Sequence, residues 1–231
     1  NAGNLLSNST LDISTEDALK NCKFGLKDDV NPQFVMFADG QSFNVEGSAT
    51  INSSLKRIYA MVTVQMEFTG MNEGVRVVPQ SVQLKHIPTG GSLGVGNKIQ
   101  SDNECLIDGE KIAKGSNDRF LAEGHAGATP LFMYENIQPD GTNAGDERTK
   151  TPYGITATDN IISIIEQDRK CSYIELVADY YKGGVNTGKV TYRFFLGEDA
   201  LTNFEVKRNV HYKVTLTLTG NGGIDEATWR V

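Results

Sequence analysis

Paired cysteines and long apolar runs are both missing from this sequence. The three cysteines, Cys22, Cys105 and Cys171, are an odd number, and no two of them form a C-x-x-C pair. Disulfide frameworks and zinc sites both require paired spacing, so we expect thiols and no intrinsic metal. No apolar stretch approaches the roughly 20 residues that a transmembrane helix needs.

Basic charge is also in short supply. The chain has 22 lysines and arginines against 29 aspartates and glutamates, a net charge of −7. Nucleic-acid binding needs a basic face, and docking on anionic lipid needs basic clusters. The composition therefore excludes nucleic acid as a partner and disfavours electrostatic docking on a membrane. Hydrophobic residues make up 39% of the chain, which is ordinary for a folded globular protein.

The dominant pattern is alternation with a period of two, which predicts half-buried strands. Within residues 57–68, one face carries Ile58, Ala60, Val62, Val64, Met66 and Phe68, and the other carries Thr63, Gln65 and Glu67. Within residues 209–220, one face carries Val210, Tyr212, Val214, Leu216 and Leu218, and the other carries His211, Lys213, Thr215, Thr217 and Thr219. Further candidate strands are 34–37, 81–87, 161–165, 172–181 and 189–197.

Turn signals separate these runs, and helix signals are few. Turn dipeptides include Asp39-Gly40, Gly90-Gly91, Asp108-Gly109, Asp140-Gly141, Gly183-Gly184 and Gly222-Gly223. Residues 14–21 begin with serine and threonine followed by acids, which predicts one short helix. Many short strands without intervening helices predict an all-β fold of two antiparallel β-sandwich domains.

We place the domain boundary near residue 90. Residues 88–129 are rich in glycine, serine, asparagine and charge, which is typical of a junction with one or two short strands. The prediction is therefore an N-terminal sandwich over residues 1–90, short for a complete domain, and a C-terminal sandwich over residues 91–231 that includes the junction. Residues 138–152 have no apolar face and should form an exposed loop.

Two loops superficially resemble binding motifs, and neither fits. Residues 90–98 lack the lysine and the following helix of a phosphate-binding loop, so we interpret them as a flexible linker. Around Asp140, Asn143, Asp146 and Glu147, the third and fifth positions of a calcium loop hold Thr142 and Ala144. We therefore expect no cofactor and no metal.

Catalytic motifs are equally hard to find. His86, His125 and His211 are far apart in the sequence, and none is spaced from a cysteine or another histidine as a metal ligand. A Ser-His-Asp site assembles in space, but no G-x-S-x-G turn is present. Surface or cross-strand roles are the expectation for these histidines, and the chain is not expected to be an enzyme.

Aromatic residues give a weak signal for ligand binding. Trp229 is the only tryptophan and a candidate glycan platform, although such a ring also packs over a sandwich end. Four tyrosines lie in predicted strands and should be core or cross-strand residues: Tyr173, Tyr180, Tyr181 and Tyr192.

Several strings, taken in order, resemble the fimbrillin-like (type V pilin) proteins. They are NSSLKRIYAMVTVQMEF at 52–68, SVQLKHIPTGGSLG at 81–94, LFMYENIQPDG at 131–141 and SYIELVADYY at 172–181. The closing strand carries the Arg-Asn-x-His-Tyr pattern and its glycine at Arg208, Asn209, His211, Tyr212 and Gly220. The resemblance covers roughly residues 34–231, including the final WRV.

This resemblance implies a structural or tip subunit of a fimbria on the outer membrane of Bacteroides-type bacteria. It implies two transthyretin-like sandwiches, other fimbrial subunits as partners, and assembly by donation of a strand. Contact with the membrane would be made only through a lipid anchor absent from this chain. Host glycans or proteins are further candidate ligands. Residue 1 is Asn, so we expect the native start to lie upstream.

A second hypothesis is a surface lipoprotein that binds glycan or protein and does not polymerise. A polymerising subunit should have an apolar groove beside an incomplete sheet, because a donated strand fills alternate side-chain pockets. The inward faces of 58–68 and 210–218 are the expected lining, and Leu5, Leu6 and Leu11 could plug the groove from the same chain. A non-polymerising module should instead have a complete sheet and an exposed aromatic patch.

Overall fold

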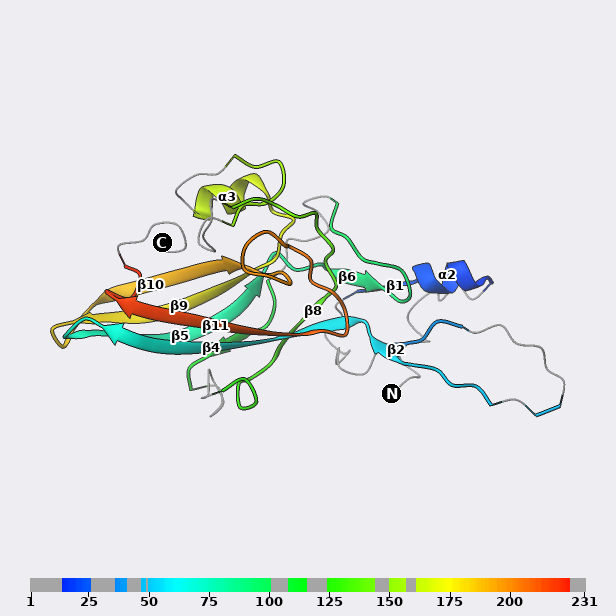
Figure 1. Cartoon of the computed structure of the whole chain (residues 1–231), viewed down its shortest axis with the longest axis horizontal. Coiled ribbons are helices and arrows are strands. Elements are labelled where there is room, and N and C mark those ends of the chain that lie inside the picture. The colour runs from blue at the N-terminus through cyan, green and yellow to red at the C-terminus, as the bar shows by residue number, and fades with distance from the viewer. Residues whose placement is uncertain are drawn as a thin grey trace.

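A computed structural model describes residues 14–25, 36–40, 47–48, 50–100, 108–115, 124–143, 150–156 and 161–224. Strands dominate the described residues, with two short helices, so the predicted all-β class is confirmed. Figure 1 shows an elongated molecule with its long strands at one end and the N-terminal elements at the other. The long strands carry the main core.

Two sheets pack face to face around this core. The four-stranded sheet has the order β10 (Val185–Phe195), β9 (Tyr173–Lys182), β5 (Val75–Lys85) and β7 (Lys111–Ala113). The three-stranded sheet has the order β11 (His211–Gly220), β4 (Tyr59–Met71) and β8 (Leu131–Tyr134). Both sheets contribute fully buried residues to one hydrophobic cluster, including Val62, Leu84, Ile174 and Leu218. The strands of these two sheets therefore form one sandwich.

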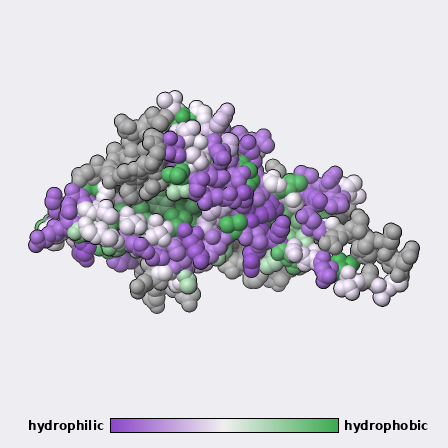
Figure 2. All heavy atoms as spheres, in the orientation of Figure 1, coloured by the Kyte–Doolittle hydropathy of each residue, from purple (hydrophilic) through white to green (hydrophobic). Residues whose placement is uncertain are grey.

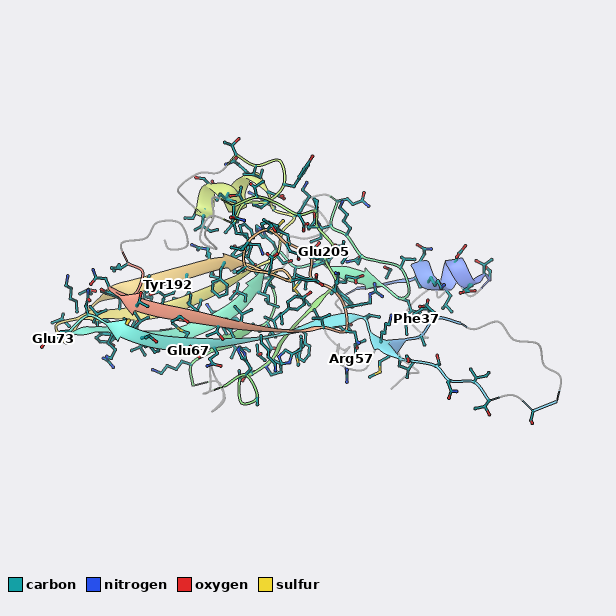
Figure 3. All side chains as sticks on the ribbon, viewed as in Figure 1. Phe37, Arg57, Glu67, Glu73, Tyr192 and Glu205 are labelled. Atoms are coloured by element: carbon teal, nitrogen blue, oxygen red, sulfur yellow. The ribbon has the colours of Figure 1, made fainter. Side chains whose placement is uncertain are left out.

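The predicted alternation sets which side chains enter the core. Ala60, Val62 and Val64 of β4 are buried, and so are Tyr212, Leu216 and Leu218 of β11. Tyr192 of β10, labelled in Figure 3, is also buried, and its hydroxyl donates a hydrogen bond of 2.7 Å to Gly222 O. Phe68 departs from the prediction and is 47% exposed, because β4 runs beyond the core at that end.

A two-residue turn joins β9 to β10. Gly183 and Gly184 have φ angles of 58° and 81°. Two consecutive positive φ angles are typical of the hairpin turns whose twist matches that of the strands, and glycine adopts them without strain. The glycine pair predicted this turn.

The pairing of β11 with β4 corrects the antiparallel prediction. These two strands run parallel, with Val214 beside Val64 and Leu216 beside Met66. A parallel pair needs a long crossover rather than a hairpin. The strands β5 to β10 lie between β4 and β11 in the sequence. Alternation along a strand indicates which face is buried and leaves the direction of its neighbour open.

The predicted division into two sandwiches near residue 90 does not match these sheets. β4 and β5 precede residue 90, yet β4 pairs with β8 and β11, and β5 pairs with β7 and β9. Each sheet thus takes strands from both sides of the boundary. The described part of 88–129 contains two short strands, β6 and β7, in agreement with the one or two predicted for this stretch.

The N-terminal elements form a small extension of the sandwich. They are α2 (Glu16–Asn21), β1 (Lys23–Gly25) paired with β6 (Gly90–Ser92), and β2 (Met36–Phe37) paired with β3 (Lys56–Arg57). The predicted helix is confirmed, and the Thr15 hydroxyl caps it by accepting a hydrogen bond of 3.0 Å from Ala18 N. The prediction of a flexible linker over residues 90–98 is wrong, because this range includes β6, which pairs with β1.

Residues 161–165 form a helix rather than the predicted strand. In α3 (Ile161–Gln167), the buried residues are Ile161, Ile164 and Ile165. Their spacing of three and four places them on one helical face, which packs with Phe195 and Phe204. A short apolar run fits a strand or a buried helix equally well, and here packing on the sheet decides.

Candidate functional site

The two main sheets end side by side in β10 and β11. Each is the terminal strand of its sheet, and no strand in the described part of the chain pairs with the outer edge of either. An edge strand presents a row of unpaired N–H and C=O groups that another strand can join. Because both edges lie on the same side, the sandwich is open between them.

A groove of about 850 Å³ occupies this opening. Figure 2 shows apolar residues gathered in a recess between the two strands. The apolar lining comes from β10, β11 and the segments beside them: Ile161, Phe194, Phe195, Leu196, Val210, Val214 and Leu216. Val210 is 38% exposed and Val214 is only half-buried, so both could gain burial from an occupant.

The wall made by β11 alternates along its length. Tyr212, Leu216 and Leu218 are buried in the core, while Thr215, Thr217 and Thr219 are on the other face. The side chains of β11 therefore point to the two faces of the strand in turn along the groove. A strand laid against this edge would place every second side chain toward Phe194 and Val214.

Lys150 lies at one end of the groove and is almost completely buried, at 4% exposure. Its Nζ donates hydrogen bonds to Asp199 O at 2.9 Å and Leu196 O at 3.3 Å, and lies 4.5 Å from the centre of the Phe204 ring. Burial lowers the pKa of Lys150 to about 8, and the negative charge of Asp199 partly offsets this effect. Through these contacts, the amine connects the residues around 150 with the segment 196–204.

Sequence reasoning missed Lys150, and placed it in an exposed loop. The structure buries the ends of that loop, with Gln138 at 3% exposure and Thr151 at 1%. Thr142 and Thr151 exchange two backbone hydrogen bonds of 2.8 Å. No pattern in the polar sequence 138–152 signals this burial, because it depends on the distant segment 196–204.

Asp199 forms the turn that closes the same end. Its Oδ1 accepts hydrogen bonds from the N–H groups of Leu201 at 2.8 Å, Thr202 at 2.7 Å and Asn203 at 2.9 Å. These donors, that of Asn203 above all, lower the pKa of Asp199 because they favour the carboxylate. The end wall of the groove is thus a tightly hydrogen-bonded turn.

The Arg-Asn-x-His-Tyr pattern positions the start of β11. Asn209 has a φ of 59°, its N–H donates to Tyr59 O at 2.7 Å, and its Oδ1 accepts from Arg57 N at 3.1 Å. The Tyr212 hydroxyl accepts from Lys207 N at 2.8 Å and donates to Glu205 O at 3.2 Å. The pattern therefore has a structural role beside the groove.

The histidines are distributed as cross-strand and loop residues. His211 of β11 contacts Thr63 of β4, as expected for a cross-strand role, and His125 reaches the same threonine from the turn 124–128. His86 lies apart from them, with its ring against the edge of Tyr173. No pattern in the sequence indicates that His125 and His211 meet, since 85 residues lie between them and Thr63 joins them only in space.

The remaining sequence candidates are easily placed. Tyr173, Tyr180 and Tyr192 are buried in strands, and the ring of Tyr181 lies 4.1 Å below the Arg76 guanidinium. Asp140 accepts a hydrogen bond of 3.1 Å from Asn203 Nδ2. Several candidates lie outside the described residues: Leu5, Leu6, Leu11, Cys105, Asp146, Glu147 and Trp229. Cys22 and Cys171 are present as thiols.

Metal-binding and membrane-spanning features were sought in the described ranges. No group of three or more histidine, cysteine, aspartate or glutamate side chains is arranged there to hold a metal ion. None of the helices described has the length and apolar character to cross a membrane.

Comparisons with known proteins support the fold. Residues 131–216 match a domain family of unknown function (DUF4906), and this range holds β8 to β10 and most of β11. No curated protein matches the chain significantly. A crystal structure from Bacteroides eggerthii, provisionally described as a cell adhesion protein, aligns with a TM-score of 0.50 and 13% identity. The alignment covers 92% of this chain and 64% of the other, so the chain shares its fold with part of a longer protein.

Proposed function

We propose that this chain is a structural or tip subunit of a cell-surface adhesive fimbria that accepts a strand from a neighbouring subunit between β10 and β11. In this proposal the protein is not an enzyme. It resides at the outer membrane surface, held through a lipid anchor or through other subunits. The likeness to a protein described in terms of cell adhesion and the fimbrillin-like sequence strings support the proposal.

The observation that carries the proposal is the open groove between two terminal strands, which has both apolar and polar lining residues. β11 offers an edge of 10 residues, about 33 Å long at the usual rise per residue, and its pairing with β4 is regular as far as Leu218. A strand added there would satisfy backbone groups of β11 and bury Val210, Val214 and Phe194. Assembly then depends on the sandwich itself, because strand addition joins subunits through main-chain hydrogen bonds and buried side chains.

The groove differs in part from the one that the sequence predicted. The face of 210–218 lines it as expected, but the second wall is β10 rather than 58–68. β4 cannot provide that wall, because it lies between β8 and β11 in the middle of its sheet.

Synthetic peptides provide the test. We would add peptides copied from residues 1–13, 209–219 and 221–231, each with a scrambled control, to the purified chain and follow thermal unfolding. A strand that binds only the folded state stabilises it by about 2.7 kcal/mol at a hundredfold excess over Kd. For a domain of this size, that corresponds to a rise in Tm of about 5–10 °C.

Two matched variants locate the binding site. Val210→Asp places a charge in the groove, and Val185→Asp places the same charge on the β9–β10 turn, where Val185 is 64% exposed. Both variants should fold. Val210→Asp should abolish the peptide-induced rise in Tm, and Val185→Asp should keep it. Absence of any rise for every peptide, or equal effects of the two variants, would count against strand acceptance.

A second candidate function is a non-polymerising surface lipoprotein that binds a glycan or a protein ligand in the groove. The volume of about 850 Å³ favours it, since small-molecule sites usually span about 300–1,000 Å³. In this case an oligosaccharide panel, and not the extended peptides, should raise the Tm of the chain, and Val210→Asp should weaken that effect.

A further inference from the structure

Two histidines and a threonine meet on the outer face of the three-stranded sheet. The Thr63 hydroxyl of β4 lies 2.8 Å from Nε2 of His211 in β11 and 3.0 Å from Nδ1 of His125 in the turn 124–128. The other ring nitrogen of His125 lies 3.1 Å from Thr215 Oγ1. Thr63 is only 2% exposed although it is on the polar face of β4, because this turn covers it.

The hydrogen-bond arrangement requires at least one neutral imidazole. The Thr63 hydroxyl carries one proton, so it donates to one ring nitrogen and accepts from the N–H of the other ring. Two protonated rings offer only N–H groups, so the hydroxyl proton would lose its acceptor. Two positive charges would then flank a buried oxygen atom. Both effects would destabilise the bridge.

The charged side chain that most affects His211 is unfavourable to protonation. From β11, Lys213 adds a positive charge on the same face. From β4, the outward residues after Thr63 are Gln65 and Glu67, and Gln65 Nε2 donates to Glu67 Oε1 at 2.9 Å. Figure 3 shows Glu67 on the outer side of β4, further along the strand. The described residues of the turn, 124–128, contribute no charged group besides His125.

We propose that the His125–Thr63–His211 bridge is a pH-sensitive latch, which holds the turn 124–128 on the outer face of β4 and β11 at neutral pH and releases it in mildly acidic medium. The latch acts on β11, one wall of the groove, but it does not depend on what the groove binds. The direction of its pH dependence follows from the environment of His211. Burial first, and then the charges of Lys213 and His125, lower the pKa of His211 below its ordinary value of 6.5.

A lowered pKa in the folded state fixes the direction of the pH dependence. The unfolded chain takes up the proton at a higher pH than the folded chain does. The stabilisation from the neutral ring is therefore complete above pH 6.5 and is lost as the pH falls below that value. Acid should open the turn before it unfolds the sandwich, because the bridge is on the surface of the sheet and outside the main core.

Hydrogen exchange of the turn tests the latch. We would measure protection of amides in 124–128 at pH 7.5 and pH 5.0 in the whole chain, corrected for intrinsic exchange rates. Protection in the wild type should fall between pH 7.5 and pH 5.0, because protonation of the rings removes the acceptor of the Thr63 hydroxyl proton. His125→Ala and the isosteric Thr63→Val should show low protection at both pH values. Thr217→Val, on the same face of β11 but beyond the bridge, should behave like the wild type.

An NMR titration of His211 is the second measurement. The ring should titrate below 6.5 in the wild type, and its pKa should rise in His125→Ala, because the electrostatic repulsion between the two rings in acid is removed. Equal protection of the turn at both pH values in the wild type would overturn the latch. So would a loss of protection in acid that persists in both bridge variants, or a His211 pKa unchanged by His125→Ala.

Discussion

Arg208 and Glu135 form a charged pair at the start of β11, with Nη2 2.8 Å and Nε 3.0 Å from Glu135 Oε2. The other guanidinium N–H groups donate to the carbonyl oxygens of Ser92, Leu93 and Val95. All five donors of one arginine are thus used, and they join β11, the end of β8 and the segment after β6. Lysine could not replace this planar fork.

Removing this arginine should be costly. Arg208→Ala leaves the Glu135 carboxylate, 7% exposed, without its cation, and breaking such a buried pair typically costs about 3–5 kcal/mol. Urea unfolding monitored by circular dichroism measures the loss. The neighbouring Lys207→Ala removes surface ion pairs with Glu198 and Glu205 and should change the midpoint much less. Equal effects of the two variants would show that Arg208 has no special role.

Lys150 should make stability rise in alkaline solution. Its folded-state pKa of about 8 is below the ordinary value of 10.5, so between these values the folded chain loses a proton that the unfolded chain keeps. As the pH rises through this window, the folded chain no longer carries the buried charge, and its free energy of unfolding increases by about 2–3 kcal/mol in total.

The control for this effect is Lys150→Met, which keeps the side-chain length and removes the charge. Urea unfolding at pH 7.0 and 10.0 should show the wild type gaining stability relative to the variant at the higher pH. Other lysines and tyrosines titrate equally in both proteins and cancel in the difference. A difference that does not change with pH would mean that the amine is not desolvated in solution.

Much of this architecture was readable from local sequence. The inward faces of β4 and β11, the Gly183-Gly184 turn and the capped helix α2 each follow from a few adjacent residues. Those patterns depend on the chain's own geometry, namely side-chain alternation, positive φ angles and an N-cap hydroxyl.

The errors concern contacts between distant segments. The parallel direction of β11, the shared sheets on both sides of residue 90 and the burial of Lys150 depend on partners more than 40 residues away. Residues 161–165 could have been recognised as helical, because Ile161, Ile164 and Ile165 fit helical spacing. The groove was half predicted, since the β11 face was visible in the sequence and the β10 wall was not.

Gly91 of β6 should be required for packing. A Cβ at this position would lie 2.6 Å from Cδ1 of Tyr134, whose ring stacks on Tyr59 and is buried. Gly91→Ala should therefore destabilise the fold by about 1–3 kcal/mol through overpacking. Gly96→Ala is the matched control, since the nearest atom to its Cβ is 3.9 Å away. Thermal unfolding of both variants decides, and a tolerated Gly91→Ala would mean that the β6 segment shifts easily.

The central claim is that β11 is an open edge that accepts a strand. In a strand, successive amides point to opposite neighbours, so only alternate amides of β11 can bond to β4. Residue-resolved amide exchange across His211–Gly220 measures both sets. The account predicts that alternate amides exchange fast in the isolated chain and become protected when a peptide strand binds or subunits assemble. Uniform slow exchange along β11 in the isolated chain, or protection on assembly that leaves these amides unchanged, would contradict it.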